Sequence, residues 1–71
     1  DKAIENFRLA VRYDKEDEGA WLGLGEAYEK KKLYKEALEA YKAAYQINPE
    51  SRAAEKIPQL RIRMLEEKHR D

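Results

Sequence analysis

One stretch constrains the fold of this chain more than any other, because it places two large aromatic groups and a glycine on one side of a helix. Trp21, Leu24, Gly25 and Tyr28 recur at the spacing i, i+3, i+4 and i+7, which puts them on a single helix face. Glycine has no side chain, so Gly25 allows a second helix to approach the backbone closely. The stretch therefore predicts a helix packed tightly against a neighbouring helix.

A second helical stripe follows, and a proline ends it. Ala37, Tyr41 and Ala44 lie at i, i+4 and i+7, and Pro49 stops the run because proline is not accommodated in a helix interior. The spacing resembles the tetratricopeptide repeat (TPR), in which Trp-x2-Leu-Gly-x2-Tyr is followed by Ala-x3-Phe and then Pro on a 34-residue period. Tyr41 stands at the Phe position. One period earlier the chain carries the same stripe, at Ala3, Phe7 and Ala10.

The resemblance implies an all-α fold of TPR type, an α-solenoid fragment of about four antiparallel helices in a single domain over residues 1–71. Residues 1–17 would hold the second helix of a preceding repeat, 18–51 a complete repeat, and 52–71 a capping helix ending at residue 70. The expected helices cover 2–13, 18–31, 34–47 and a run from near Ser51 to residue 68, with Ser51 as an N-cap. The residues assigned to repeat packing are Trp21, Leu24, Gly25, Tyr28, Ala37, Tyr41, Ala44 and Pro49. Those expected to be buried are Trp21, Tyr28, Tyr41 and Ala44.

Two positions depart from the simplest version of the pattern. The family usually places a glycine where Lys32 stands, at a turn position that tends to be left-handed, so Lys32 predicts local strain. Gly23 lies on the face that would line the inner groove, and we interpret it as widening that groove.

Composition excludes several classes of function. Lys and Arg number 15 and so do Asp and Glu, so no net charge attracts nucleic acid or an anionic membrane. No stretch reaches the roughly 18 apolar residues that a membrane span needs. The absence of cysteine rules out disulfides and favours a reducing, cytoplasmic compartment.

The chain shows no catalytic constellation, and we predict that it is not an enzyme and has no cofactor or metal. His69 is the only histidine and has no cysteine or second histidine as a co-ligand. Ser51 is better used as a helix cap than as a nucleophile. The acidic run at 14–18 lacks the glycine and the late glutamate of a calcium-binding loop.

The resemblance implies a protein–protein interaction scaffold that binds a partner peptide or helix in the concave groove lined by the first helix of each repeat. One version of that groove holds the C-terminal carboxylate of Hsp70 or Hsp90 with cationic residues. The groove positions here include Leu22 and Glu26 and no cation, so that activity is not supported. Half-TPR and pentatricopeptide repeats are alternatives, although the Trp21 to Tyr28 spacing favours TPR.

Self-association and an accessory role within a larger multidomain protein are the alternative functions. Helical repeats do not bury their faces alone, and about three are needed for stability. Residues 1–13 should keep a bare apolar side, through some of Ile4, Phe7 and Val11, that a second chain could cover in a homo-oligomer or a domain swap.

The fourth predicted helix carries two apolar stripes, and their orientation decides where a partner would bind. The repeat register assigns the second stripe to packing against residues 34–47 and leaves the first open to the groove, beside Leu22. Alternatively, Pro58 bends the helix so that both stripes are buried. The first stripe is Ala53, Ile57, Leu60 and Met64, and the second is Ala54, Pro58, Ile62 and Leu65. The partner-binding residues predicted for an open first stripe are Leu22, Glu26, Lys56, Ile57, Leu60 and Met64.

Overall fold

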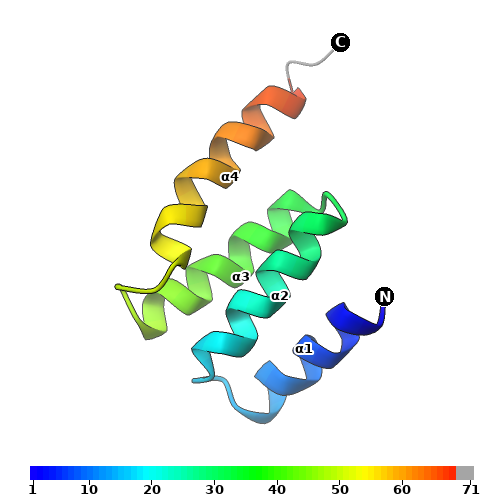
Figure 1. Cartoon of the computed structure of the whole chain (residues 1–71), viewed down its shortest axis with the longest axis vertical. Coiled ribbons are helices and arrows are strands. Elements are labelled where there is room, and N and C mark those ends of the chain that lie inside the picture. The colour runs from blue at the N-terminus through cyan, green and yellow to red at the C-terminus, as the bar shows by residue number, and fades with distance from the viewer. Residues whose placement is uncertain (69–71) are drawn as a thin grey trace.

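The computed structural model describes residues 1–68 as four α-helices joined by short turns (Figure 1). Helix α1 spans Lys2–Tyr13, α2 spans Glu18–Lys30, α3 spans Tyr34–Ile47 and α4 spans Ala53–Lys68, with no strand in residues 1–68. The predicted all-α repeat fold is confirmed, and each helix begins and ends within two residues of its expected position. His69 and the last residues of the predicted capping segment lie outside the described residues.

Each helix packs against the next one along the chain, and the chain direction alternates between them (Figure 1). The Cα atoms occupy 40 × 28 × 12 Å, so the molecule is thin in one dimension. Its buried apolar residues form two clusters, one centred on Tyr41 between α2, α3 and α4, and one on Leu24 between α1, α2 and α3. A thin stack of this kind leaves broad faces open to a partner.

Side-chain caps begin three of the helices. The Asp1 carboxylate accepts hydrogen bonds from the Ala3 and Ile4 amides at 2.8 and 3.3 Å, and Asp17 accepts one from Ala20 at 3.1 Å. Such bonds satisfy amide groups that the first helical turn leaves without a partner. The Ser51 hydroxyl accepts a hydrogen bond from the Ala53 amide at 3.1 Å, although α4 begins two residues after Ser51.

Gly25 and Tyr41 make the close contact between α2 and α3. A Cβ atom built on Gly25 would lie 2.7 Å from the Tyr41 ring, closer than two carbon atoms can stand. Tyr41 has no solvent-exposed surface, and its hydroxyl donates a hydrogen bond of 2.8 Å to the Glu29 carboxylate. Burial raises the pKa of Tyr41 well above its ordinary value, and the hydrogen bond to Glu29 makes a smaller contribution in the same direction.

The turn between α2 and α3 has the left-handed residue that the resemblance implies. Lys32 has φ of +62°, and it is the one non-glycine residue with positive φ within residues 1–68. The Leu33 amide donates to the Tyr28 carbonyl at 2.9 Å and the Lys32 amide to the Glu29 carbonyl at 2.9 Å. These two bonds form a Schellman motif, which glycine usually completes.

The contact between α1 and α2 corrects two expectations. Gly23 does not widen a groove, because a Cβ atom there would overlap the Phe7 ring of α1. Val11 is buried, and Ile4 and Phe7 pack against the same cluster, so the prediction that they form a bare apolar side is wrong. The apolar side of α1 faces α2 because the Phe7 ring occupies the space above Gly23. The exposed large apolar residues of α1 are Leu9 and Tyr13.

Candidate partner-binding surfaces

The predicted groove face between α2 and α4 is partly closed by the chain itself. Leu60 is only 2% exposed, and it packs in one cluster with Leu22, Tyr41 and Ala53. The prediction that Leu22 and Leu60 face a partner is therefore wrong, because both side chains are in the core. Ile57 packs partly against the same cluster.

The two stripes of α4 have the opposite orientation to the one that the register predicts. The first stripe packs inward, whereas Ile62 and Leu65 of the second are 58% and 57% exposed. Pro58 and Arg61 stand one 34-residue period after the buried Leu24 and Ala27. Packing α4 in strict register would bury the Arg61 guanidinium without a partner, which is costly. The alternative in which both stripes are buried is also wrong.

The remaining groove residues lie at the surface. The Arg52 guanidinium and the Glu26 carboxylate form an ion pair at 3.5 Å, so the Glu26 charge already has a partner. Lys56, Ile57 and Met64 are partly exposed. The face between α2 and α4 therefore offers a partner a few separate side chains and, within residues 1–68, no continuous apolar surface.

A hydrogen-bonded link that the sequence did not predict joins the start of α2 to the turn between α3 and α4. The Asn48 amide group donates to the Glu18 carboxylate at 3.1 Å. A hydrogen bond from Ser51 is the largest influence on Glu18, and together with the Asn48 bond it lowers the pKa of this carboxylate. Pro49 lies between the two donors and fixes the course of the turn.

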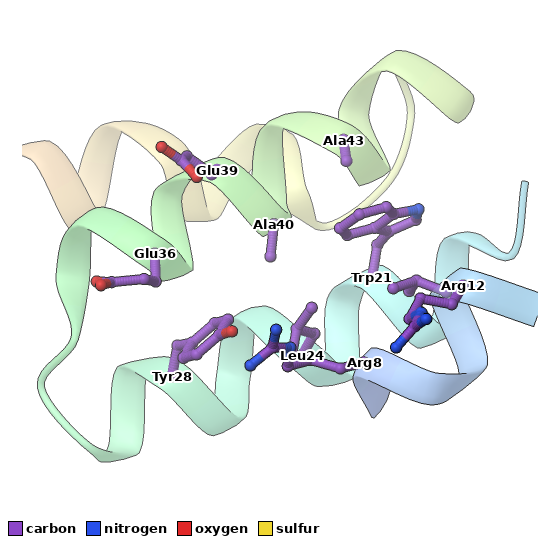
Figure 2. Close-up of a pocket in the computed structure, with 10 residues that line it drawn as sticks. Arg8, Arg12, Trp21, Leu24, Tyr28, Glu36, Glu39, Ala40 and Ala43 are labelled. Atoms are coloured by element: carbon purple, nitrogen blue, oxygen red, sulfur yellow. The ribbon is translucent and has the colours of Figure 1, made fainter. Parts of the chain in front are cut away.

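A second open surface is a cleft of about 610 Å³ between α1 and α3, with α2 as its floor (Figure 2). Trp21, Leu24 and Tyr28 rise from α2 into it, and Ala40 lies opposite on α3. Trp21 and Tyr28 are half-buried, so the prediction that they are buried is wrong. The small side chains of α3 leave part of each aromatic ring uncovered. The Trp21 indole N–H donates to the Lys15 carbonyl at 3.0 Å, which fixes the ring at one end of the cleft.

The two sides of the cleft carry opposite charge. Arg8 and Arg12 extend from α1, whereas Glu36 and Glu39 belong to α3. All four side chains are exposed, and within residues 1–68 none of them takes part in an ion pair. We call this surface, with its aromatic floor, basic α1 side and acidic α3 side, the α1–α3 cleft. Its charges are available to a partner.

Sequence reasoning missed the cleft, although part of its signal was present. Arg8 and Arg12 stand four residues apart and Glu36 and Glu39 three apart, so each pair shares a helix face. Nothing in the sequence says that those faces border one opening, because that depends on the separation of α1 from α3.

The described part of the chain shows neither a cluster of metal ligands nor a membrane-spanning helix. No group of three or more potential metal ligands occurs within residues 1–68. None of the four helices is long and apolar enough to cross a membrane.

Comparison with known proteins places this architecture in a family. A profile of the tetratricopeptide repeat matches residues 1–52. The chain is similar to superkiller protein 3 of Schizosaccharomyces pombe, with 43% identity over 49 residues. That similarity covers 69% of this chain but only 4% of the relative, so the chain spans a small part of that protein's length. No solved structure matches the chain. The matched profile, together with the close packing of Gly25 on Tyr41, shows that this chain belongs to the tetratricopeptide repeat family.

Proposed function

We propose that this chain is a protein–protein interaction module and that its partner docks in the α1–α3 cleft. The observation that carries the proposal is the half-buried aromatic floor of Trp21 and Tyr28 between unpaired charges of opposite sign. Aromatic rings that stay partly exposed gain apolar contact when a partner covers them. Unpaired charges on both sides then select the orientation of the partner.

The chemistry of the cleft defines the partner. Its floor favours an apolar stripe, such as that of an amphipathic helix. The arginines favour acidic residues on one flank of that helix, and the glutamates favour basic residues on the other. A helix with this pattern satisfies every exposed charge of the cleft, whereas a flank of the wrong sign leaves like charges facing each other.

The groove face remains a secondary candidate surface. Glu26, Lys56, Ile57 and Met64 are exposed enough to add contacts to a partner that lies across α2 and α4. The division into a half repeat, a complete repeat and a capping helix is likewise a proposal, as are the cytoplasmic location and an accessory role in a larger protein. Self-association is a second candidate function, favoured by the exposed apolar residues of α4.

The intrinsic fluorescence of the chain gives a direct test, because Trp21 is its only tryptophan. The probe is a synthetic amphipathic helix whose apolar stripe has glutamates on one flank and lysines on the other. Binding should shift the Trp21 emission to shorter wavelength as the indole loses water. The control is a peptide with the same stripe and glutamates on both flanks. A peptide with its acidic and basic flanks exchanged would not serve, because it could bind in the cleft in the opposite direction.

A variant pair separates binding in the cleft from binding elsewhere. Ala43→Lys adds a long side chain to the cleft wall, whereas Ala3→Lys makes the same change at an exposed position of α1 outside the cleft. We expect the first variant to lose the emission shift and the second to keep it, with unchanged helical circular dichroism in both. Equal binding of the two peptides, or equal binding by the two variants, would refute the proposed site.

A further inference from the structure

The outward face of α4 has an apolar stripe with nothing packed on it. Ile62 and Leu65 are more than half exposed, and Ala54 and Pro58 continue the stripe toward the start of the helix. Exposed apolar groups scattered singly are common on protein surfaces, but a continuous stripe along one helix often marks an interaction site. The stripe lies on the side of α4 opposite to the buried Leu60.

The charges beside this stripe are segregated by sign. Each residue turns an α-helix by about 100°, so Glu55 and Glu66 lie roughly 60–80° to one side of Pro58. Arg61 and Lys68 lie roughly 60–80° to the other side by the same measure. All four are exposed, and none is in an ion pair within the described chain. We call the stripe with its acidic and basic flanks the α4 outward face.

The α4 outward face and the α1–α3 cleft are complementary in shape and charge. One is a convex apolar stripe with an acidic and a basic flank, and the other is an open apolar cleft with a basic and an acidic side. Placing the stripe on Trp21 and Tyr28 brings the acidic flank to Arg8 and Arg12 when the basic flank meets α3. Only one direction of α4 along the cleft makes both pairings, so the charges specify the orientation.

We propose that the α4 outward face of one copy of this chain docks in the α1–α3 cleft of a second copy. The proposal rests on the proposed function of the cleft and names its occupant. The contact joins two different surfaces, so it is heterologous, and it gives a ring where the rotation between copies closes and a filament where it does not. It differs from the stacking of repeats, because α4 enters between two helices that are already paired with α2.

Sedimentation velocity of the whole chain over about a hundredfold dilution tests for self-association, which must weaken on dilution by mass action. Ile62→Glu places a charge in the centre of the stripe at an exposed position, so it should give a monomer with unchanged helical circular dichroism. Leu33→Glu makes the same change at an exposed apolar residue in the turn before α3 and should associate like the parent. Monomers of the parent chain at every concentration would overturn the proposal.

A charge exchange identifies the contacting surfaces. The cleft variant is Arg8→Glu with Arg12→Glu, and the helix variant is Glu55→Arg with Glu66→Arg. Each alone should weaken self-association about tenfold or more, the effect of about 1.4 kcal/mol of lost pairing. Their equimolar mixture should restore association between the two variants, because opposite charges again face each other.

Two controls decide how a failure is assigned. Lys30→Glu with Lys35→Glu reverses two exposed charges near the α2–α3 turn and should leave association unchanged. If the mixture does not associate although both variants keep their helicity, α4 does not occupy the cleft. If the parent is monomeric but the synthetic peptide still shifts the Trp21 emission, the cleft binds another protein and only the present inference fails. If neither occurs, the proposed function fails as well.

Discussion

Replacing Gly25 with alanine tests whether α2 and α3 are as close as their packing indicates. The added Cβ atom would stand 2.7, 2.8 and 2.9 Å from three carbon atoms of the Tyr41 ring, whereas carbon atoms in contact normally lie about 3.5–4.0 Å apart. The ring has little freedom to withdraw, because it is fully buried and its hydroxyl is hydrogen-bonded to Glu29. The helices must therefore separate by several tenths of an ångström or more.

Two effects of opposite sign decide the magnitude. Overpacking a filled core costs about 1–3 kcal/mol, whereas alanine is favoured over glycine in a helix interior by about 1 kcal/mol. We expect a net loss of about 0–2 kcal/mol for Gly25→Ala. Gly19→Ala isolates the favourable effect, because a Cβ atom there meets only the Asp17 carboxylate oxygen at 3.5 Å. That variant should gain up to about 1 kcal/mol, so the two should differ by roughly 1–3 kcal/mol.

Urea unfolding followed by circular dichroism measures both free energies of unfolding on the same scale. In thermal melts a difference of 1 kcal/mol corresponds to about 4–8 °C for a domain of this size. Equal stabilisation by Gly25→Ala and Gly19→Ala would refute the reasoning, since it would mean that the Tyr41 ring does not rest on the Gly25 backbone.

Three further predictions test other parts of the structure. Leu60→Ala should lower the free energy of unfolding by about 2–5 kcal/mol in urea titrations, because Leu60 is buried. Ile62→Ala, at an exposed position, should change this free energy by no more than about 0.5 kcal/mol. Similar effects of the two substitutions would contradict the orientation of α4. Lys32→Gly should raise the free energy of unfolding by about 1 kcal/mol, because glycine adopts a positive φ without strain. A lower melting temperature of this variant would show that Lys32 makes a stabilising contact. The pKa of Glu18 is lowered in the folded chain, so its stabilising contribution is present above the unfolded pKa and is lost as pH falls through the folded one. Glu18→Gln should therefore flatten the acid side of the stability curve in melts across pH 2–6, and an unchanged slope there would count against the Ser51 and Asn48 contacts.

The parts of this fold that the sequence predicted are those set by contacts within one repeat. The helix periods and the close helix approach at Gly25 are local features that follow from spacing and residue size, and the left-handed turn at Lys32 is a local feature that the family resemblance implies. Tyr41 was expected to be buried because it stands at the Phe position of the repeat pattern, in one stripe with Ala37 and Ala44. Such features depend on few distant residues, so they can be recognised from one sequence.

The parts that were missed depend on how one helix rotates or separates relative to another. The register alone would have placed Arg61 of α4 against α3, whereas the observed rotation leaves its charge exposed to solvent. Trp21 and Tyr28 carry the strongest signal for packing, yet their exposure is set by the distance between α1 and α3. The candidate site therefore became visible only in three dimensions, although its charges can be read from the sequence.

The link from Glu18 to Asn48 has a consequence for how the chain unfolds. Repeat proteins are often approximated as a row of units in which each interacts only with its neighbours, so that an end can fray while the remainder stays folded. Here a hydrogen bond spans 30 residues and joins the first residue of α2 to the residue that follows α3. Opening either helix removes that bond, so α2 and α3 should lose structure together. Helices α1 and α4 lie outside this closed loop, so an end helix can detach while α2 and α3 stay folded.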